Sequence, residues 1–182
     1  MTPQKGVADD QLGQYYRRVS AIADRLGKSL SFQFVMDMLQ RIHDGFVRRV
    51  RVDRTRTPVQ IIDATGRFRG YIDEKVLAEM PLAGREEDDV IVFELDYDPT
   101  VDELDREYES RDLKPDPSAL AQAMTDDPAF ADERPIAVYW RNSNGQACYA
   151  IFVRWEDDGR GVHVGCSDDR WSRSSRFAGV RK

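Results

Sequence analysis

The last third of the chain alternates apolar and polar residues on both sides of a tight turn, and this pattern constrains the fold most. From residue 146 to residue 155 the apolar side chains occupy every second position: Ala147, Tyr149, Ile151, Val153 and Trp155. This spacing is typical of one face of a β-strand. The Asn144-Gly145 dipeptide before it favours a hairpin turn, because both residues tolerate positive φ. With further strands at 136–141, 162–166 and 176–181, the pattern predicts an antiparallel β-meander.

The first part of the chain has the spacing of helices. Apolar residues recur every three or four positions from Asp10 to Leu26 and again from Ser31 to Asp44, as they do on the buried stripe of an amphipathic helix. The two segments predict an N-terminal helical hairpin. Residues 46–72 and 89–95 are rich in β-branched side chains, which predicts the strands of a small mixed sheet.

We therefore expect an α+β protein in two parts. Residues 1–128 are predicted to form a helical and α+β domain with an acidic insertion, and residues 129–182 a β-rich C-terminal binding module. Inside the insertion, Thr100 and Glu103 have the spacing of a capping box, in which each side chain accepts a hydrogen bond from the other residue's backbone amide. A helix is therefore expected to begin after Thr100.

Charge is distributed unevenly along the 182 residues. Residues 81–135 carry 18 acidic and 5 basic side chains, whereas both flanking segments are net positive and the whole chain has a net charge of -6. An acidic surface repels phosphates, which argues against a nucleic acid partner. The arginines between Val47 and Arg56 are expected to pair with the acidic segment rather than with a phosphate.

Several kinds of site have no counterpart in the sequence. It contains no P-loop, dinucleotide-binding or metal-binding motif, so we expect no cofactor and no metal. Its two cysteines are too few for a disulfide scaffold, and Cys148 is expected to be a small buried apolar residue. No apolar stretch approaches the roughly 20 residues of a membrane span, and the N-terminus lacks the apolar core of a secretory signal. We therefore expect a cytoplasmic protein without a membrane partner.

All three tryptophans lie in the C-terminal part, at Trp140, Trp155 and Trp171. On the strand at 146–155, the side opposite the regular apolar face carries residues of uneven size and polarity, including Phe152 and Arg154. A core face needs apolar residues of matched volume, so the uneven face is interpreted as a ligand surface. The alternative is that it is the solvated side of an antiparallel sheet.

The segment from Trp171 to Lys182 resembles the last strand of C-type-lectin-like modules. In particular it resembles the formylglycine-enzyme-like variable domains of target proteins of diversity-generating retroelements in bacteria and phages, which end on a tryptophan, a polar loop and an F-x-x-V-R-like strand. The resemblance covers residues 129–182 and implies a non-enzymatic protein that binds a protein or other macromolecule on a rigid sheet. By position it implies these ligand contacts: Phe152, Arg154, His163, Ser167, Asp169, Trp171, Arg173 and Ser175.

Two other functions remain open. The segment 90–100 resembles the first motif of haloacid-dehalogenase-type phosphatases, which implies Asp96 as nucleophile and Asp98 as acid and base beside Mg²⁺. The plainer interpretation is a buried strand that ends in an acidic loop before the helix. The other function is that of an acidic phage or mobile-element protein, whose surface over residues 86–109 mimics nucleic acid and blocks a basic partner.

Overall fold

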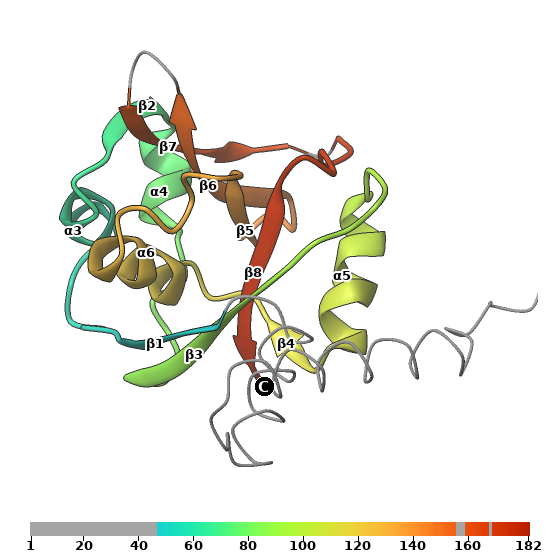
Figure 1. Ribbon diagram of the computed structural model, residues 1–182, viewed down its shortest axis with the longest axis horizontal. Coiled ribbons are helices and arrows are strands. Elements are labelled where there is room, and N and C mark those ends of the chain that lie inside the picture. Colours follow the sequence, from blue (N-terminus) through green and yellow to red (C-terminus); the bar gives the residue numbers. More distant parts are fainter. Residues whose placement is uncertain (1–46, 156–158, 168) are drawn as a thin grey trace, which may run out of the picture. The chain divides into compact units, whose positions relative to one another are not determined.

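The computed structural model describes residues 47–155, 159–167 and 169–182 (Figure 1). The chain divides into two compact units, Met1–Gln40 and Arg41–Lys182, and every described residue belongs to the second. The predicted helical hairpin lies outside the described residues. The predicted domain boundary at residue 128 falls inside the second unit, because strands from both sides of that residue join one sheet.

The described residues form an α+β fold, as predicted, with eight strands and four helices. In chain order these are β1 (Val47–Arg51), α3 (Pro58–Ala64), β2 (Phe68–Ile72), α4 (Glu74–Ala78), β3 (Glu87–Phe93), α5 (Val101–Ser110), β4 (Leu113–Lys114), α6 (Pro117–Asp126), β5 (Ile136–Arg141), β6 (Ala147–Trp155), β7 (Gly159–Cys166) and β8 (Arg176–Arg181). None of these four helices has the length and apolar character needed to cross a membrane.

Seven strands lie side by side in the order β1-β3-β8-β5-β6-β7-β2, and β4 pairs with β8. The sheet is mixed, because β5 is parallel to β8 and β2 is parallel to β7, whereas the other neighbours are antiparallel. The predicted meander holds for the consecutive strands β5, β6 and β7 only. Its last step is wrong: β8 does not pair with β7 but inserts between β3 and β5.

The two faces of the sheet are covered differently. Helices α3, α4 and α6 pack on one face, which we call the inner face, and join the larger apolar core there (Figure 1). Helix α5 packs on the opposite, outer face, where Leu104 and Tyr108 share a smaller core with Phe93 of β3 and Phe177 of β8. Since α5 lies over only this part of the sheet, the outer side of β6, β7 and β2 remains partly exposed.

The sequence pattern predicts strands throughout residues 46–72, but the middle of this segment is helix α3. The side chain of Thr57 accepts a hydrogen bond from the backbone amide of Gln60 (3.3 Å), and the side chain of Gln60 accepts one from the amide of Thr57 (2.9 Å). Pro58 follows at a position where a helix needs no amide partner. This capping box outweighs the strand preference of the β-branched residues that follow.

Two other local predictions are confirmed. Thr100 and Glu103 form the expected capping box at the start of α5. The arginine-rich strand β1 pairs with β3 of the acidic segment, and Arg49 lies 3.3 Å from Glu87 in an ion pair. Basic and acidic parts of the sequence therefore neutralise each other within one strand pair.

Cys148 and Cys166 lie opposite each other on β6 and β7 and form a disulfide. Cys148 is fully buried, as expected, but it is not a free thiol. The bridge joins residues 18 positions apart, so it limits the conformations of the unfolded chain and stabilises the β6–β7 hairpin.

We expect reduction of this disulfide to lower the free energy of unfolding by about 2–3 kcal/mol, as for loops of similar length. Urea unfolding with and without dithiothreitol measures the difference. The double variant Cys148→Ala, Cys166→Ala is the control, because its stability should not respond to the reductant. Equal stability of the wild-type protein under both conditions would contradict a stabilising role for the bridge.

Candidate functional site

Three of the eight predicted ligand contacts are buried. Phe152 is 0% exposed, Trp171 7% and Ser175 9%. Phe152 lies on the inner face, so the prediction that it belongs to an exposed surface is wrong. The reason is packing. Cys148 and Ala150 are small and Phe152 is large, and side chains of unequal size on this strand pack closely against the side chains of the inner-face helices.

The remaining predicted contacts do not meet in one place. Five of them are exposed or half-buried: Arg154, His163, Ser167, Asp169 and Arg173. Arg154 lies 3.3 Å from Asp132, which Arg160 also binds at 2.7 Å. The backbone amide of Arg173 donates to Asp98 (2.7 Å) in a different region. Only His163 takes part in the surface described next.

A group of aromatic and aliphatic side chains lies on the outer side of β6, β7 and β2. We call it the aromatic sheet face, and its members are Phe68, Tyr71, Tyr149, Ile151, Val153, Trp155 and His163. Phe68 and Tyr71 are 62% and 56% exposed, and the other members are half-buried. The alternating residues of β6 were predicted to form the core, so the sequence pattern did not predict this surface.

A β-bulge brings an additional aromatic residue of β2 onto this face. Arg69 pairs with Val162 and Tyr71 pairs with His163, so the register shifts at Gly70. The ring of Tyr71 thereby reaches β7, where its Cε1 atom would lie 3.1 Å from a Cβ added to Gly165. Burial, and secondarily the neighbouring Tyr71, raises the pKa of Tyr149.

Glycines beneath the rings allow the aromatic side chains to lie against the backbone. A Cβ at Gly161 would overlap the six-membered ring of Trp155, and one at Gly70 would lie 2.6 Å from Nε2 of His163. Such close approach of a side chain to a strand requires glycine. The ring of Trp155 fills the space above Gly161 and is half-buried.

His163 packs against Trp155 with their ring centroids 5.2 Å apart. Its Nε2 atom is buried and has no hydrogen-bond partner among the described residues. A buried polar atom without a partner costs free energy, and this cost accompanies the packing of the imidazole between Trp155 and Gly70.

We expect Gly161→Ala to displace the ring of Trp155 and to destabilise the protein by about 1–3 kcal/mol, the usual cost of overpacking. Thermal unfolding and tryptophan fluorescence measure the two effects. Gly165→Ala is the matched control on the same strand, because its nearest neighbours would lie 3.1 Å away and can adjust. A Gly161→Ala protein with unchanged stability and fluorescence would contradict this placement of Trp155.

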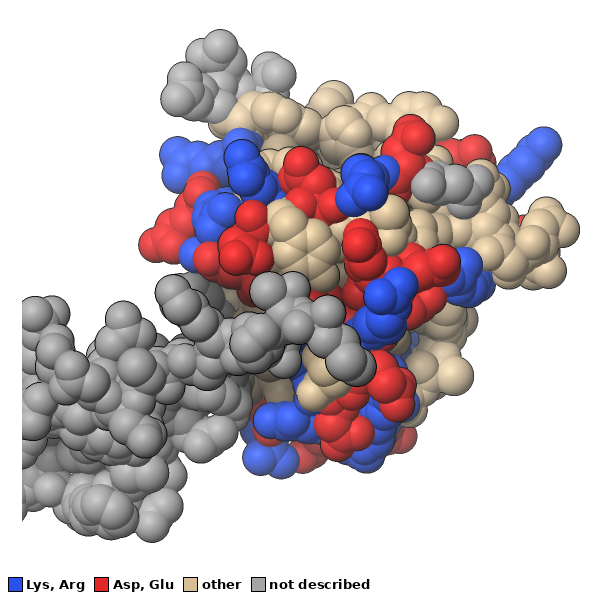
Figure 2. Space-filling model, turned by 90° about the vertical axis from the view of Figure 1, so that its right-hand side faces the viewer, with Lys and Arg blue, Asp and Glu red and all other residues tan. Residues whose placement is uncertain are grey.

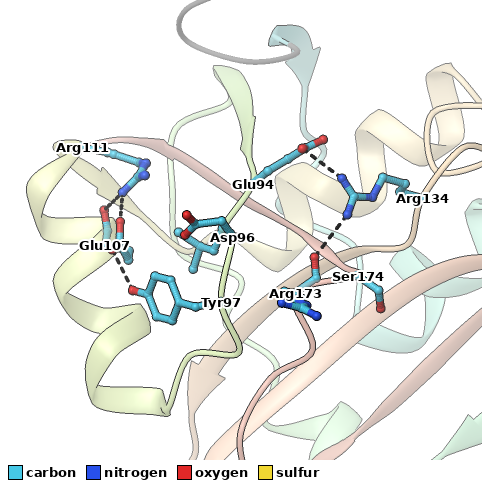
Figure 3. A pocket seen from close by; sticks show the side chains of 9 residues that line it. Glu94, Asp96, Tyr97, Glu107, Arg111, Arg134, Arg173 and Ser174 are labelled. Atoms are coloured by element: carbon cyan, nitrogen blue, oxygen red, sulfur yellow. Dashed lines mark hydrogen bonds and ion pairs between the residues drawn. The ribbon is translucent and has the colours of Figure 1, made fainter. Parts of the chain in front are cut away.

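A charged cleft of about 650 Å³ lies between the end of β3, α5 and the segment before β8 (Figure 3). Arg111 binds Glu107, which also accepts a hydrogen bond from Tyr97 (2.8 Å). Burial, followed by the effect of Glu107, raises the pKa of Tyr97 to about 12. On the other wall, Arg134 lies 2.9 Å from Glu94. Most charges in this cleft are therefore already paired.

Asp96 lines the cleft and is exposed. Asp98, its expected catalytic partner, instead binds the backbone amide of Arg173. The strand before them, β3, is antiparallel to both neighbours, whereas the phosphatase resemblance implies parallel strands. Within the described ranges, no three His, Cys, Asp or Glu side chains are grouped so that they could hold a metal ion. The geometry thus leaves Asp96 as a solvent-facing carboxylate.

Acidic and basic side chains are interspersed on the side of the molecule that carries α5 (Figure 2). Arg141 lies 2.6 Å from Asp105, and Arg170 lies 3.6 Å from Glu103. Both arginines come from outside the acidic segment 81–135. The acidic segment therefore does not form an uninterrupted negative surface on this side.

Glu94 is the best test of the cleft's ion pairs. The hydrogen bond from Arg176 (2.7 Å), with a further contribution from Arg134, lowers the pKa of Glu94. A lowered pKa means that the carboxylate stabilises the fold above its unfolded-state pKa, and that this contribution is lost as the pH falls through the folded-state value. We expect Glu94→Gln to destabilise the protein at pH 7 by less than about 1 kcal/mol, since Glu94 is half-exposed.

Thermal unfolding of wild type and Glu94→Gln from pH 7 to pH 3 should show this difference shrinking as the pH falls. Glu87→Gln is the control, because Glu87 has one exposed ion pair with Arg49, and its effect should be smaller. A difference that grows toward acid pH would contradict the sign of the pKa shift.

Comparison of the chain with protein family models, with curated proteins and with solved structures found no match in any of the three.

Proposed function

We propose that this chain is a non-enzymatic binding protein that holds a macromolecular ligand on the aromatic sheet face. The observation that carries the proposal is that exposed and half-buried rings cluster on the outer side of β6, β7 and β2, where no outward position is Lys, Arg, Asp or Glu. An exposed apolar patch on a folded protein usually marks an interaction site. A centre rich in aromatic residues and poor in charge is typical of recognition surfaces.

A solvated sheet face would carry polar side chains at its outward positions. The three strands do contain arginines, but these lie on the inner side or at the sheet edge. Arg69 lies 2.7 Å from Glu74, and Arg154 and Arg160 share Asp132. The lack of charge is thus specific to the aromatic sheet face and not a property of the strands as a whole, which supports the proposal.

The proposal moves the surface implied by the lectin-like resemblance to the opposite side of β6. Phe152 is part of the core and Arg154 belongs to an ion pair, so neither is proposed as a contact. The proposal keeps a protein or other macromolecule as the ligand and no cofactor.

The experiment is capture of the ligand from an extract of the source cells on immobilised protein. We expect Tyr71→Asp and Val153→Asp to abolish capture, because each places a charge on an uncharged surface. Both side chains are at least partly exposed, so the melting temperature should change little. Arg154→Ala, on the other side of β6, is the matched control and should retain the wild-type ligand. Loss of the ligand with Arg154→Ala but not with Tyr71→Asp would refute the proposal.

A further inference from the structure

The aromatic sheet face combines ring surfaces with uncharged polar atoms at the ring edges. Tyr71, Tyr149 and Trp155 each carry one such atom, and none of these three atoms is hydrogen-bonded to a described residue. The face therefore offers stacking surfaces and neutral hydrogen-bonding groups side by side.

The rings are held in place before any ligand arrives. Trp155 lies between Gly161 and His163. Tyr149 packs edge-on against the buried Trp171, with ring centroids 5.6 Å apart. Fixed rings lose little conformational entropy on binding, which favours a ligand that stacks on them.

The surrounding charges disfavour a ligand that carries phosphates. Proteins that stack single-stranded nucleic acid place cations beside their aromatic residues. Here the arginines of the same strands are bound to carboxylates on the other side of the sheet or at its edge, and the chain is net negative. An uncharged ligand complements this face better than a polyanion does.

We propose that the ligand of the aromatic sheet face is an uncharged carbohydrate chain. The inference rests on the proposed function, because it names the class of ligand for the same surface. A sugar ring has an apolar side of C–H groups, which stacks favourably on the electron-rich face of an aromatic ring. Its edges carry hydroxyl groups, which can donate to or accept from tyrosine hydroxyls and can accept from the indole N–H.

A protein ligand fits the polar atoms of this face less well. The centre of a tight protein interface is dry, so hydrogen-bonding atoms that meet only apolar side chains there remain unsatisfied at a cost. Hydroxyl groups of a sugar supply a partner for each of them. The same polar atoms that would weaken a dry protein contact therefore favour a carbohydrate.

Affinity electrophoresis of the full chain in native gels tests the inference, with glycogen, laminarin, xylan and galactomannan as neutral polysaccharides and alginate as an acidic one. We expect at least one neutral polysaccharide to retard the protein and alginate not to retard it. Trp155→Ala should abolish the retardation. Tyr71→Phe, which removes one hydroxyl and keeps the ring, should weaken binding about fivefold. Arg154→Ala should bind as the wild type does.

Since Trp155 covers Gly161, its removal could unfold the region, so Tyr71→Ala serves as a second ring deletion at an exposed position. Its melting temperature is measured alongside. The inference is overturned if no neutral polysaccharide retards the wild type, or if retardation persists in both Trp155→Ala and Tyr71→Ala. If the face variants lose a captured protein while no polysaccharide binds, the inference fails and the proposed function stands.

Discussion

The packing of β6 against the helices decides which side of the sheet is open. Phe152 fills the space that Ala150 and Cys148 leave between β6 and the inner-face helices, so one row of the strand is fully buried. Because side chains of a strand alternate, the next row must point the other way. That row contains Tyr149 and Trp155. It remains accessible as the aromatic sheet face because α5 covers only β3, β8 and β5.

Local signals in the sequence were enough to predict several elements. The strand at 176–181 has the predicted bounds, and Thr100 caps a helix as expected, since turn and cap chemistry act over a few residues. Which face of β6 is buried could not be predicted, because both rows contain enough apolar volume to form a core. Which row is buried depends on where helices from other parts of the chain pack. The disulfide and the contact of Tyr71 with Gly165 could not be predicted either, because both depend on strand register, which no local pattern specifies.

The uneven charge of the sequence has a structural counterpart in ion pairs between distant segments. Arg49 of β1 binds Glu87 of β3, and Arg141 of β5 binds Asp105 of α5. Exposed pairs of this kind each contribute little free energy. Their larger effect is on the surface, where they mix the two signs of charge and set the uncharged aromatic sheet face apart from its surroundings.

The position of β8 has a consequence for the order in which the sheet can assemble. This strand lies in the middle of the sheet, between β3 and β5, yet it leaves the ribosome after every other described strand. While it is still in the exit tunnel, β3 and β5 expose backbone groups that only β8 can pair. The sheet is thus joined into one piece only when β8 has emerged from the tunnel, and the strand edges of β3 and β5 stay open until then.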